Sequence, residues 1–267
     1  MIDSVFGPDG ELARHIPGFQ PRPAQTEMAE AVAQALNDHE SLLAEAGTGT
    51  GKTFAYLVPA LMSGLKVIVS TGTKNLQDQL YHKDLPLVRQ ALEQPVTTAL
   101  LKGRANYLCL HRLEANAERP IFRSPEQAGQ YRRIQQWAGR TRSGDIAELD
   151  DIPEDAPVWP HVTSTADNCL GHECPKANQC HLLKARKAAQ EADVVVVNHH
   201  LFFADMALRD EGNGELLPGA NAVIFDEAHQ LPEIASNFFG ISLTSRQLQE
   251  LAGDILTESK IVDHHNR

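Results

Sequence analysis

Short apolar runs alternate with longer segments of helical composition along most of the chain. The run from Val194 to Val197 is four consecutive valines, apolar on both faces, as a strand covered by helices on both sides requires. This alternation is typical of an α/β domain built on a parallel sheet. The pattern predicts strands at residues 41–45, 66–70, 97–101, 194–197 and 222–226.

Helical composition predicts helices over residues 26–36, after Gly51, over 75–81 and over 179–192. The last of these is rich in Ala, Lys, Arg and Leu, which favour helices. The α/β alternation stops near Leu101 and resumes at Ala192. All four cysteines lie between these two points, so we expect an insertion carried by the α/β domain. The last stretch, from residue 245 to 267, also has helical composition.

Composition places the chain among globular proteins with a substantial core, because 42% of its 267 residues are hydrophobic and 22% are charged. The longest apolar run, residues 54–62, is too short to span a membrane. The N-terminus lacks the basic stretch and apolar core of a signal peptide. Four cysteines in so long a chain are too few for a disulfide scaffold, so we expect a reducing cytoplasm.

Charge is distributed unevenly along the chain. The net charge is −11, which repels nucleic acid on average. Residues 102–142 nevertheless carry nine Lys and Arg against three Glu, a local charge of +6, and residues 145–155 then carry six acids and no base. The basic block is either a local binding surface for a polyanion or simply a solvated helical face.

A glycine-rich segment follows the first expected strand and precedes an expected helix, as a phosphate-binding loop requires. Its glycines let backbone N–H groups point at an anion, and the helix N-terminus adds positive potential. Lys52 can then reach the β- and γ-phosphates, and the Thr53 hydroxyl can ligate Mg²⁺. Ala46 replaces the usual first glycine. The segment consists of Ala46, Gly47, Thr48, Gly49, Thr50, Gly51, Lys52 and Thr53.

The strand expected at 222–226 ends in two acids, and such a strand end supplies the other half of a nucleotide site. Asp226 falls at the carboxyl edge of the sheet, where ligands of parallel sheets bind. We expect Asp226 to hold Mg²⁺ and Glu227 to polarise the attacking water. Together with the phosphate loop, these residues predict that the chain binds and hydrolyses a nucleoside triphosphate.

The phosphate loop and the tetrapeptide Asp-Glu-Ala-His at 226–229 together resemble the first motor domain of superfamily 2 helicases. The resemblance implies a RecA-like domain that binds ATP. It further implies that Gln25, in the segment before the first long helix, reads the adenine base. His229 would couple the state of the nucleotide to the grip on nucleic acid.

The segment after the second expected strand is similar to the helicase motif that grips the nucleic-acid backbone. Its short neutral donors, Thr71, Thr73 and Gln79, are suited to phosphate oxygens. Without the family, the same residues describe only a strand–turn–helix junction with an ordinary helix cap.

The cysteines have the composition of a ligand set, and three of them lie within twelve residues. The two Cys-x(2–4)-Cys pairs usual for zinc are absent, whereas a [4Fe–4S] cluster takes four thiolates at less regular spacings. From the residues alone, a cluster, a zinc site in which His172 or His181 replaces a thiolate, and four unliganded thiols all remain open. The cysteines are Cys109, Cys169, Cys174 and Cys180.

The position of the cysteines, between the phosphate loop and the Asp-Glu-Ala-His motif, resembles that of the [4Fe–4S] domain in XPD/DinG-type DNA helicases. Residues 102–109 resemble the segment that leads to the first ligand, and residues 193–201 resemble the return into the motor domain. The resemblance implies a cluster on all four cysteines and 5′→3′ translocation on single-stranded DNA.

In such helicases the cluster domain lines the path of the single strand. The +6 block fits this role, with Lys102 and Arg104 as backbone contacts and Tyr107 or Trp137 as rings that stack on a base. Both aromatic residues also fit ordinary core positions. A nucleotide-switched module stabilised by zinc, without unwinding activity, and an RNA helicase remain as alternatives.

The expected organisation is a first part of the motor domain at 1–101, an iron–sulfur insertion at 102–191, a second part of the motor domain at 192–243, and the start of a further, arch domain at 244–267. No second motor domain is expected in this chain, so we expect little unwinding by the chain alone. The resemblance implies DNA repair or replication as its setting and a replication clamp-loader subunit as a protein partner. We further expect a monomer with no membrane contact.

Overall fold

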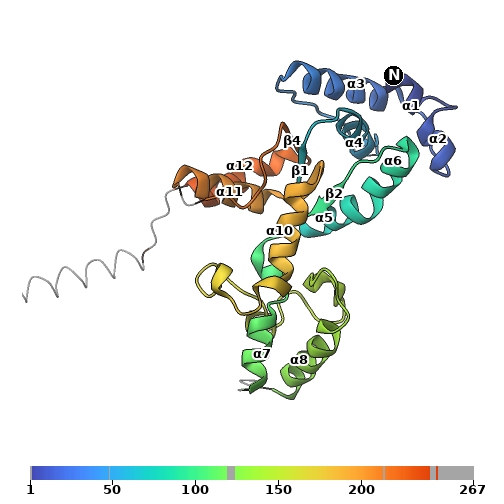
Figure 1. Ribbon diagram of the computed structural model, residues 1–267. Coiled ribbons are helices and arrows are strands. Elements are labelled where there is room, and N and C mark those ends of the chain that lie inside the picture. Colours follow the sequence, from blue (N-terminus) through green and yellow to red (C-terminus); the bar gives the residue numbers. More distant parts are fainter. Residues whose placement is uncertain (1, 48, 119–123, 213, 241–244, 246–267) are drawn as a thin grey trace, which may run out of the picture.

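The computed structural model describes residues 2–47, 49–118, 124–212, 214–240 and 245 (Figure 1). The helix and arch segment expected at 244–267 therefore lie outside the described residues, apart from Ser245. Among the described residues, no helix combines the length and the apolar character needed to cross a membrane.

Four parallel strands form one sheet in the order β2-β3-β1-β4. This sheet confirms the predicted parallel α/β architecture, and each of the four strands begins and ends within one residue of its expected position. The runs predicted them well because branched apolar side chains fill both faces of a buried parallel strand. The strands are β1 (Val67–Thr71), β2 (Thr98–Leu100), β3 (Val194–Asn198) and β4 (Ala222–Phe225).

The strand expected at residues 41–45 is wrong. This segment has irregular backbone, and the side chains of Leu42 and Leu43 are 44% and 92% exposed. At the edge of the sheet, β4 pairs only with β1 among the described residues, and Val223 is 38% exposed. An apolar run becomes a strand only when a neighbouring strand takes up its hydrogen bonds, and the sequence of the run does not report that neighbour.

Alternating residues of the strands build one hydrophobic core on each face of the sheet. Val67, Val69, Val194 and Val196 pack against the N-terminal helices, whereas Ile68 and the other two valines of β3 face the opposite layer. The first layer consists of α1 (Ile2–Phe6), α2 (Glu11–His15), α3 (Pro23–Asp38), α4 (Lys52–Met62) and α6 (Leu85–Leu92). The opposite layer includes α10 (His181–Glu191) and α11 (His199–Asp210).

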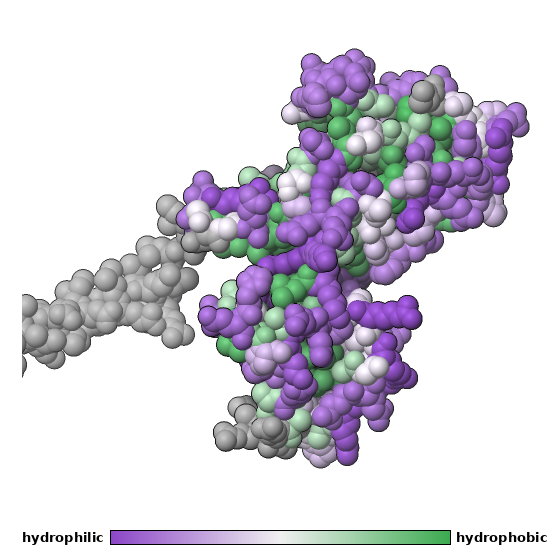
Figure 2. All heavy atoms as spheres, in the orientation of Figure 1, coloured by the Kyte–Doolittle hydropathy of each residue, from purple (hydrophilic) through white to green (hydrophobic). Residues whose placement is uncertain are grey.

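Short helices connect the strands to these layers. After β1 the chain forms α5 (Lys74–Gln79), which continues through a π-helical turn at Leu80–Asp84 into α6. After β4 a 3₁₀ turn at Ala228–Gln230 leads into α12 (Leu231–Phe239). Figure 2 shows hydrophilic residues over much of the visible face, with hydrophobic residues showing between α3 and α4.

The inserted segment has a hydrophobic core of its own and lies below the sheet in Figure 1. Trp137 is buried in this core, where its indole N–H donates a 2.8 Å hydrogen bond to Glu148, so the ring is a core residue and faces no solvent path. Core residues come from α7 (Leu110–Glu118), α8 (Pro125–Ala138), α9 (Trp159–Val162) and the loops between them.

Candidate nucleotide site and cysteine pocket

The phosphate loop turns through two glycines into the N-terminus of α4. Gly49 has a φ of 79° and Gly51, the N-cap residue, a φ of 82°, a left-handed backbone that glycine adopts without strain. The Thr50 hydroxyl donates a 2.9 Å hydrogen bond to the Gly47 carbonyl oxygen and closes the turn. Lys52 and Thr53 then begin the helix, whose free N–H groups face an incoming anion. Thr48 lies outside the described residues.

Gln25, on α3, supports this loop from behind. Its side chain is 3% exposed, and its Nε2 donates a 2.9 Å hydrogen bond to the Gly51 carbonyl oxygen. A Cβ at position 51 would lie 2.1 Å from that nitrogen, so a glycine is required there for this contact as well as for its φ. The Gln25 Oε1 is buried without a hydrogen-bond partner. It is therefore a free acceptor beside the loop.

The acids after β4 lie against the phosphate loop, as the sheet topology predicts. The Lys52 Nζ is 3.6 Å from Glu227 Oε1, and the His229 Nδ1 is 3.4 Å from Glu227 Oε2. Glu227 has a φ of 55°, a left-handed conformation that non-glycine residues seldom adopt and that is often found at functional sites. The fold thus brings Lys52, Asp226, Glu227 and His229 together.

Asp226 is half-buried beside Glu227. Burial raises the pKa of its carboxyl group, and the neighbouring Glu227 carboxylate raises it further. Both effects mean that a cation at this position would stabilise the ionised form. The Tyr56 hydroxyl is buried beside Asp226 without a hydrogen bond of standard geometry, and burial together with that carboxylate raises the pKa of Tyr56.

Sequence reasoning missed two residues that contact this group, Tyr56 and His199. Tyr56 follows Thr53 by three positions, which places both on one face of α4, and it is the polar member of an apolar run. His199 follows the four valines at the carboxyl end of β3, where polar residues lie near a ligand in parallel sheets. These two sequence positions were the signals from which Tyr56 and His199 could have been predicted as site residues.

The segment expected to grip nucleic acid runs from the last residue of β1 through α5. The Thr73 hydroxyl caps α5 by accepting a 3.2 Å hydrogen bond from the Leu76 N–H, and both Thr73 and Gln79 are exposed. Thr71 is fully buried, and its hydroxyl donates to the Thr73 carbonyl oxygen at 3.3 Å. Two of the three expected donors therefore face solvent.

Lys102 and Tyr107 do not face a nucleic-acid strand in this structure, which corrects the expectation for both. The Lys102 side chain is 1% exposed, with its Nζ 2.6 Å from Asp78 and 2.7 Å from Asp145. The buried Tyr107 hydroxyl accepts a 3.0 Å hydrogen bond from the Lys102 N–H. Lys102 thus joins α5 to the insertion, because its two acidic partners come from these two regions.

The acidic segment lies against basic residues on both sides. Arg133 of the basic block is 3.1 Å from Asp151, and Lys74 of α5 is 3.0 Å from Glu154. Part of the local positive charge is thereby neutralised within the chain. Two arginines of the block, at positions 119 and 123, lie outside the described residues.

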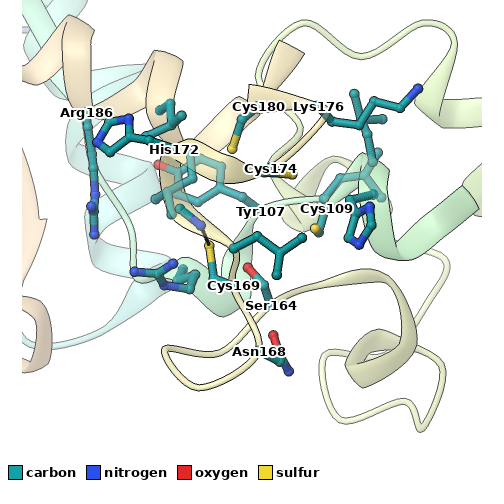
Figure 3. Close-up of a pocket in the computed structure, with 18 residues that line it drawn as sticks. Tyr107, Cys109, Ser164, Asn168, Cys169, His172, Cys174, Lys176, Cys180 and Arg186 are labelled. Carbon is teal, nitrogen blue, oxygen red and sulfur yellow. Dashed lines mark hydrogen bonds between the residues drawn. The ribbon is translucent and has the colours of Figure 1, made fainter. Parts of the chain in front are cut away.

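All four cysteines line one pocket of about 110 Å³ in the insertion (Figure 3). Cys109 precedes α7, Cys180 precedes α10, and the other two lie on the loop between α9 and α10. The sequence separation between Cys109 and the other three is bridged by backbone pairing, since the Cys109 N–H donates to the Val162 carbonyl oxygen at 2.7 Å.

The pocket combines half-buried cysteines with positive charge. Arg104 and Arg186 both line it, and burial raises the pKa of the Cys109 thiol. Among the described residues, no three His, Cys, Asp or Glu side chains lie close enough together to hold a single metal ion. The sulfur atoms instead surround a common space in Figure 3.

Comparison with known proteins assigns this chain to a family. The profile described as DEAD/DEAH box helicase matches residues 22–118, and that described as DEAD_2 matches residues 74–248, well over half of the chain. The chain belongs to the DEAD_2 family. The predicted resemblance to DinG-type helicases is thereby confirmed.

Curated relatives of this DEAD_2 chain carry helicase names. It is 53% identical to the ATP-dependent DNA helicase YoaA of Haemophilus influenzae over 96% of the chain, and 56% identical to that of Escherichia coli over 94%. It is 39% identical to the ATP-dependent helicase DinG of Mycobacterium tuberculosis over 85%. The matches cover 40%, 39% and 37% of these relatives, so the chain spans about two fifths of their length.

Proposed function

We propose that this chain is the ATP-binding motor part of a DNA helicase. The observation that carries the proposal is the approach of Glu227 to Lys52, 3.6 Å across the phosphate loop. Such a pair places a phosphate-binding cation and a water-polarising carboxylate on either side of one small space. The helicase names of the relatives support the same activity.

Each residue of the site has a definable task in binding and hydrolysis. The helix N-terminus and Lys52 bind the phosphates, and Lys52 exchanges its contact with Glu227 for the phosphate oxygens. Glu227, freed from Lys52, accepts a proton from the attacking water. Gln25, whose Oε1 is buried and unpaired, is the proposed reader of the adenine base. His229, beside Glu227, relays the state of the nucleotide to the DNA side.

Mg²⁺ fits the oxygen donors at this site. Thr53 and Asp226 would hold it: burial and the Glu227 carboxylate raise the pKa of the Asp226 carboxyl, and a cation at this position would stabilise its ionised form. When bound, Mg²⁺ neutralises charge on the phosphates. The remaining loop residues, Ala46 through Thr50, supply backbone donors.

We also propose that the four cysteines hold a [4Fe–4S] cluster. Zinc bound at about 2.3 Å would draw four sulfur atoms to within about 4 Å of each other. All four cysteines of this chain line one common space, which supports a group shared by the four thiolates. Arg104 and Arg186 would offset the thiolate charge.

Single-stranded DNA is the proposed polymer, with 5′→3′ movement. Exposed Thr73 and Gln79 are the candidate backbone contacts, and the insertion at 102–191 interrupts a motor domain formed by 1–101 and 192–243. We further propose a monomer in the cytoplasm and a replication clamp-loader subunit as partner. A zinc-stabilised switch and an RNA helicase are the alternatives.

The polymer is tested by the steady-state ATPase rate of the full-length protein with single-stranded DNA, with single-stranded RNA and with neither. Stimulation by DNA is the expected result. Stimulation by RNA alone would replace DNA as the substrate, and no stimulation by either would favour the switch.

Metal analysis tests the cluster directly. Protein purified without oxygen should contain about four irons and four acid-labile sulfides per chain. Stoichiometric zinc without sulfide would leave the ATP site in place and contradict the cluster.

A further inference from the structure

His199 lies at the point where three strands of the sheet end. It follows β3 directly, and its side chain, which is 0% exposed, reaches both Ser70 of β1 and Asp226 after β4. Carboxyl ends of parallel strands meet at one edge of the sheet, so a single side chain there can contact both neighbours. Neither the proposed binding of the nucleotide nor its proposed hydrolysis uses this histidine.

The hydrogen bonds of His199 define its tautomer. Its Nε2 is 2.9 Å from the Asp226 carbonyl oxygen, which can only accept, so Nε2 carries the proton and donates. Its Nδ1 lies 2.7 Å from the Ser70 Oγ and therefore accepts from that hydroxyl in the neutral imidazole. Both ring nitrogens are thus used in the buried state.

A third hydrogen bond closes a ring. The Asp226 N–H donates to the Ser70 carbonyl oxygen at 2.8 Å, so Ser70, His199 and Asp226 are joined in a cycle of three hydrogen bonds. Ser70 fixes Asp226 on its amino side and His199 fixes it on its carbonyl side. The backbone on either side of this acid is therefore held independently of its carboxylate.

The carbonyl that His199 holds belongs to the peptide that enters Glu227. Glu227 begins there with a φ of 55°, and this left-handed turn brings its carboxylate to Lys52. Non-glycine residues keep such a conformation only where their surroundings impose it. The hydrogen bond from His199 is one such constraint, and it acts at the turn itself.

We propose that His199 is a positioning residue that fixes the Asp226–Glu227 peptide, so that both carboxylates face the phosphate loop. The proposal rests on the proposed nucleotide site and assigns to it a buried support outside the phosphate loop and the two acids. His199 touches neither nucleotide nor metal. Its effect is transmitted through the backbone of Asp226.

The test uses the 267-residue chain and a fluorescent ATP analogue, titrated in Mg²⁺ and again in EDTA. H199F keeps an aromatic ring of similar size and removes both hydrogen bonds. We expect its affinity to fall about tenfold in Mg²⁺, the usual effect of losing a buried hydrogen bond, and less than about twofold in EDTA. H199Q, which keeps an N–H donor of similar reach, should recover most of the loss.

Gln77 supplies the matched control. It is also fully buried, and its Nε2 donates to the Leu101 and Val196 carbonyl oxygens at 2.9 and 3.2 Å, so it likewise joins strands of the same sheet. Q77L should lower the melting temperature but leave the ratio of affinities in Mg²⁺ and EDTA unchanged. The Mg²⁺-specific loss, and not the loss of stability, is the signature of positioning.

The possible results test the positioning role of His199 and the proposed nucleotide site separately. An H199F chain that loses affinity equally in Mg²⁺ and EDTA, or that matches Q77L, would show a purely structural histidine and overturn the inference. A wild-type chain that binds no nucleotide in either buffer would overturn the proposed function itself. S70A covers the case in which H199F does not fold: removing one hydroxyl should give a smaller Mg²⁺-specific loss, about threefold, and its absence would count against positioning.

Discussion

The nucleotide site and the cysteine pocket are assembled in different ways. The nucleotide site places Asp226 and Glu227 directly after β4 of a regular sheet, and Lys52 approaches Glu227 from the N-terminus of α4, which packs on that sheet. The cysteine pocket gathers its four sulfur atoms from loops and helix ends, around a separate hydrophobic core. A site on a sheet edge is organised before its ligand arrives, whereas a loop-built site gains much of its order from the ligand.

The largest expected effect separates the two sites at the pocket. C174S removes one of the four proposed cluster ligands, and we expect it to lose most of the iron that the proposed cluster would contain, because the cluster would hold these loops together. Affinity for the ATP analogue should change by less than about twofold, since the sheet edge does not depend on the insertion.

Iron content, acid-labile sulfide and analogue titration measure these effects. S164A is the matched control, because Ser164 lines the same pocket without a thiolate. A C174S chain that retained all its iron would contradict the assignment of this cysteine as a ligand.

The second prediction concerns the buried ion pairs of Lys102, which join the sheet domain to the insertion. Lys102 is buried between Asp78 of α5 and Asp145 of the insertion. K102M leaves two carboxylates without their cation, so we expect a loss of about 3 kcal/mol in the free energy of unfolding. Urea denaturation followed by circular dichroism measures it.

Lys74 provides the surface counterpart. Its pair with Glu154 is solvent-exposed, with side chains 41% and 61% exposed, so K74M should cost at most about 1 kcal/mol. Equal losses in the two variants would mean that Lys102 is hydrated in solution and not buried as the structure shows.

The ion pairs of Lys102 also show which part of the structure could not be predicted from the sequence. Four strands could be predicted because a buried parallel strand requires a continuous run of branched apolar residues. The two acids could be predicted because they follow a strand of the parallel sheet, and the phosphate loop could be predicted from its glycines and the helix that follows it, although the strand expected before it is absent. The partners of Lys102, by contrast, lie far along the chain, and no local pattern distinguishes a lysine in a buried ion pair from one on a basic surface.

Dependence on distant residues also explains why the strand predicted at 41–45 is wrong and why Tyr56 and His199 were not predicted as site residues. Leu42 and Leu43 have strand character, but pairing depends on a neighbour that the segment does not encode. His199 and Tyr56 reach Asp226 only through tertiary packing. A pattern reports which side chains are apolar or polar, and not which distant atoms they meet.

The third prediction acts on the sheet edge. K52A removes the cation that faces Glu227 and the incoming phosphates, so we expect about a 100-fold loss of ATP-analogue affinity, as for a charged hydrogen bond. Iron content should stay the same. K66A is the control, because Lys66 precedes β1 and donates to the Gln190 carbonyl oxygen at the opposite end of the strand. Loss of iron in K52A would show that the two sites are not independent.

The smallest expected effect is on the stability of the insertion, which can be followed by the fluorescence of its own tryptophans. Both tryptophans, Trp137 and Trp159, lie in its core, so their fluorescence follows this region and not the sheet. Burial raises the pKa of the Glu148 carboxyl, but hydrogen bonds from Ser143 and Trp137 outweigh it and leave the pKa below its usual value.

A carboxylate with a lowered pKa stabilises the folded state above its unfolded pKa, and the contribution disappears as the pH falls through the lower folded value. E148Q should therefore unfold more easily than the wild type at pH 7, by less than about 1 kcal/mol because solvent screens an exposed group. The difference between the two chains should disappear as the pH falls through the lowered folded pKa of Glu148. Urea titrations followed by tryptophan fluorescence, at pH 7 and at successively lower pH, measure the difference. A difference that persists in acid would mean that Glu148 stabilises the insertion by packing, and that its charge contributes nothing.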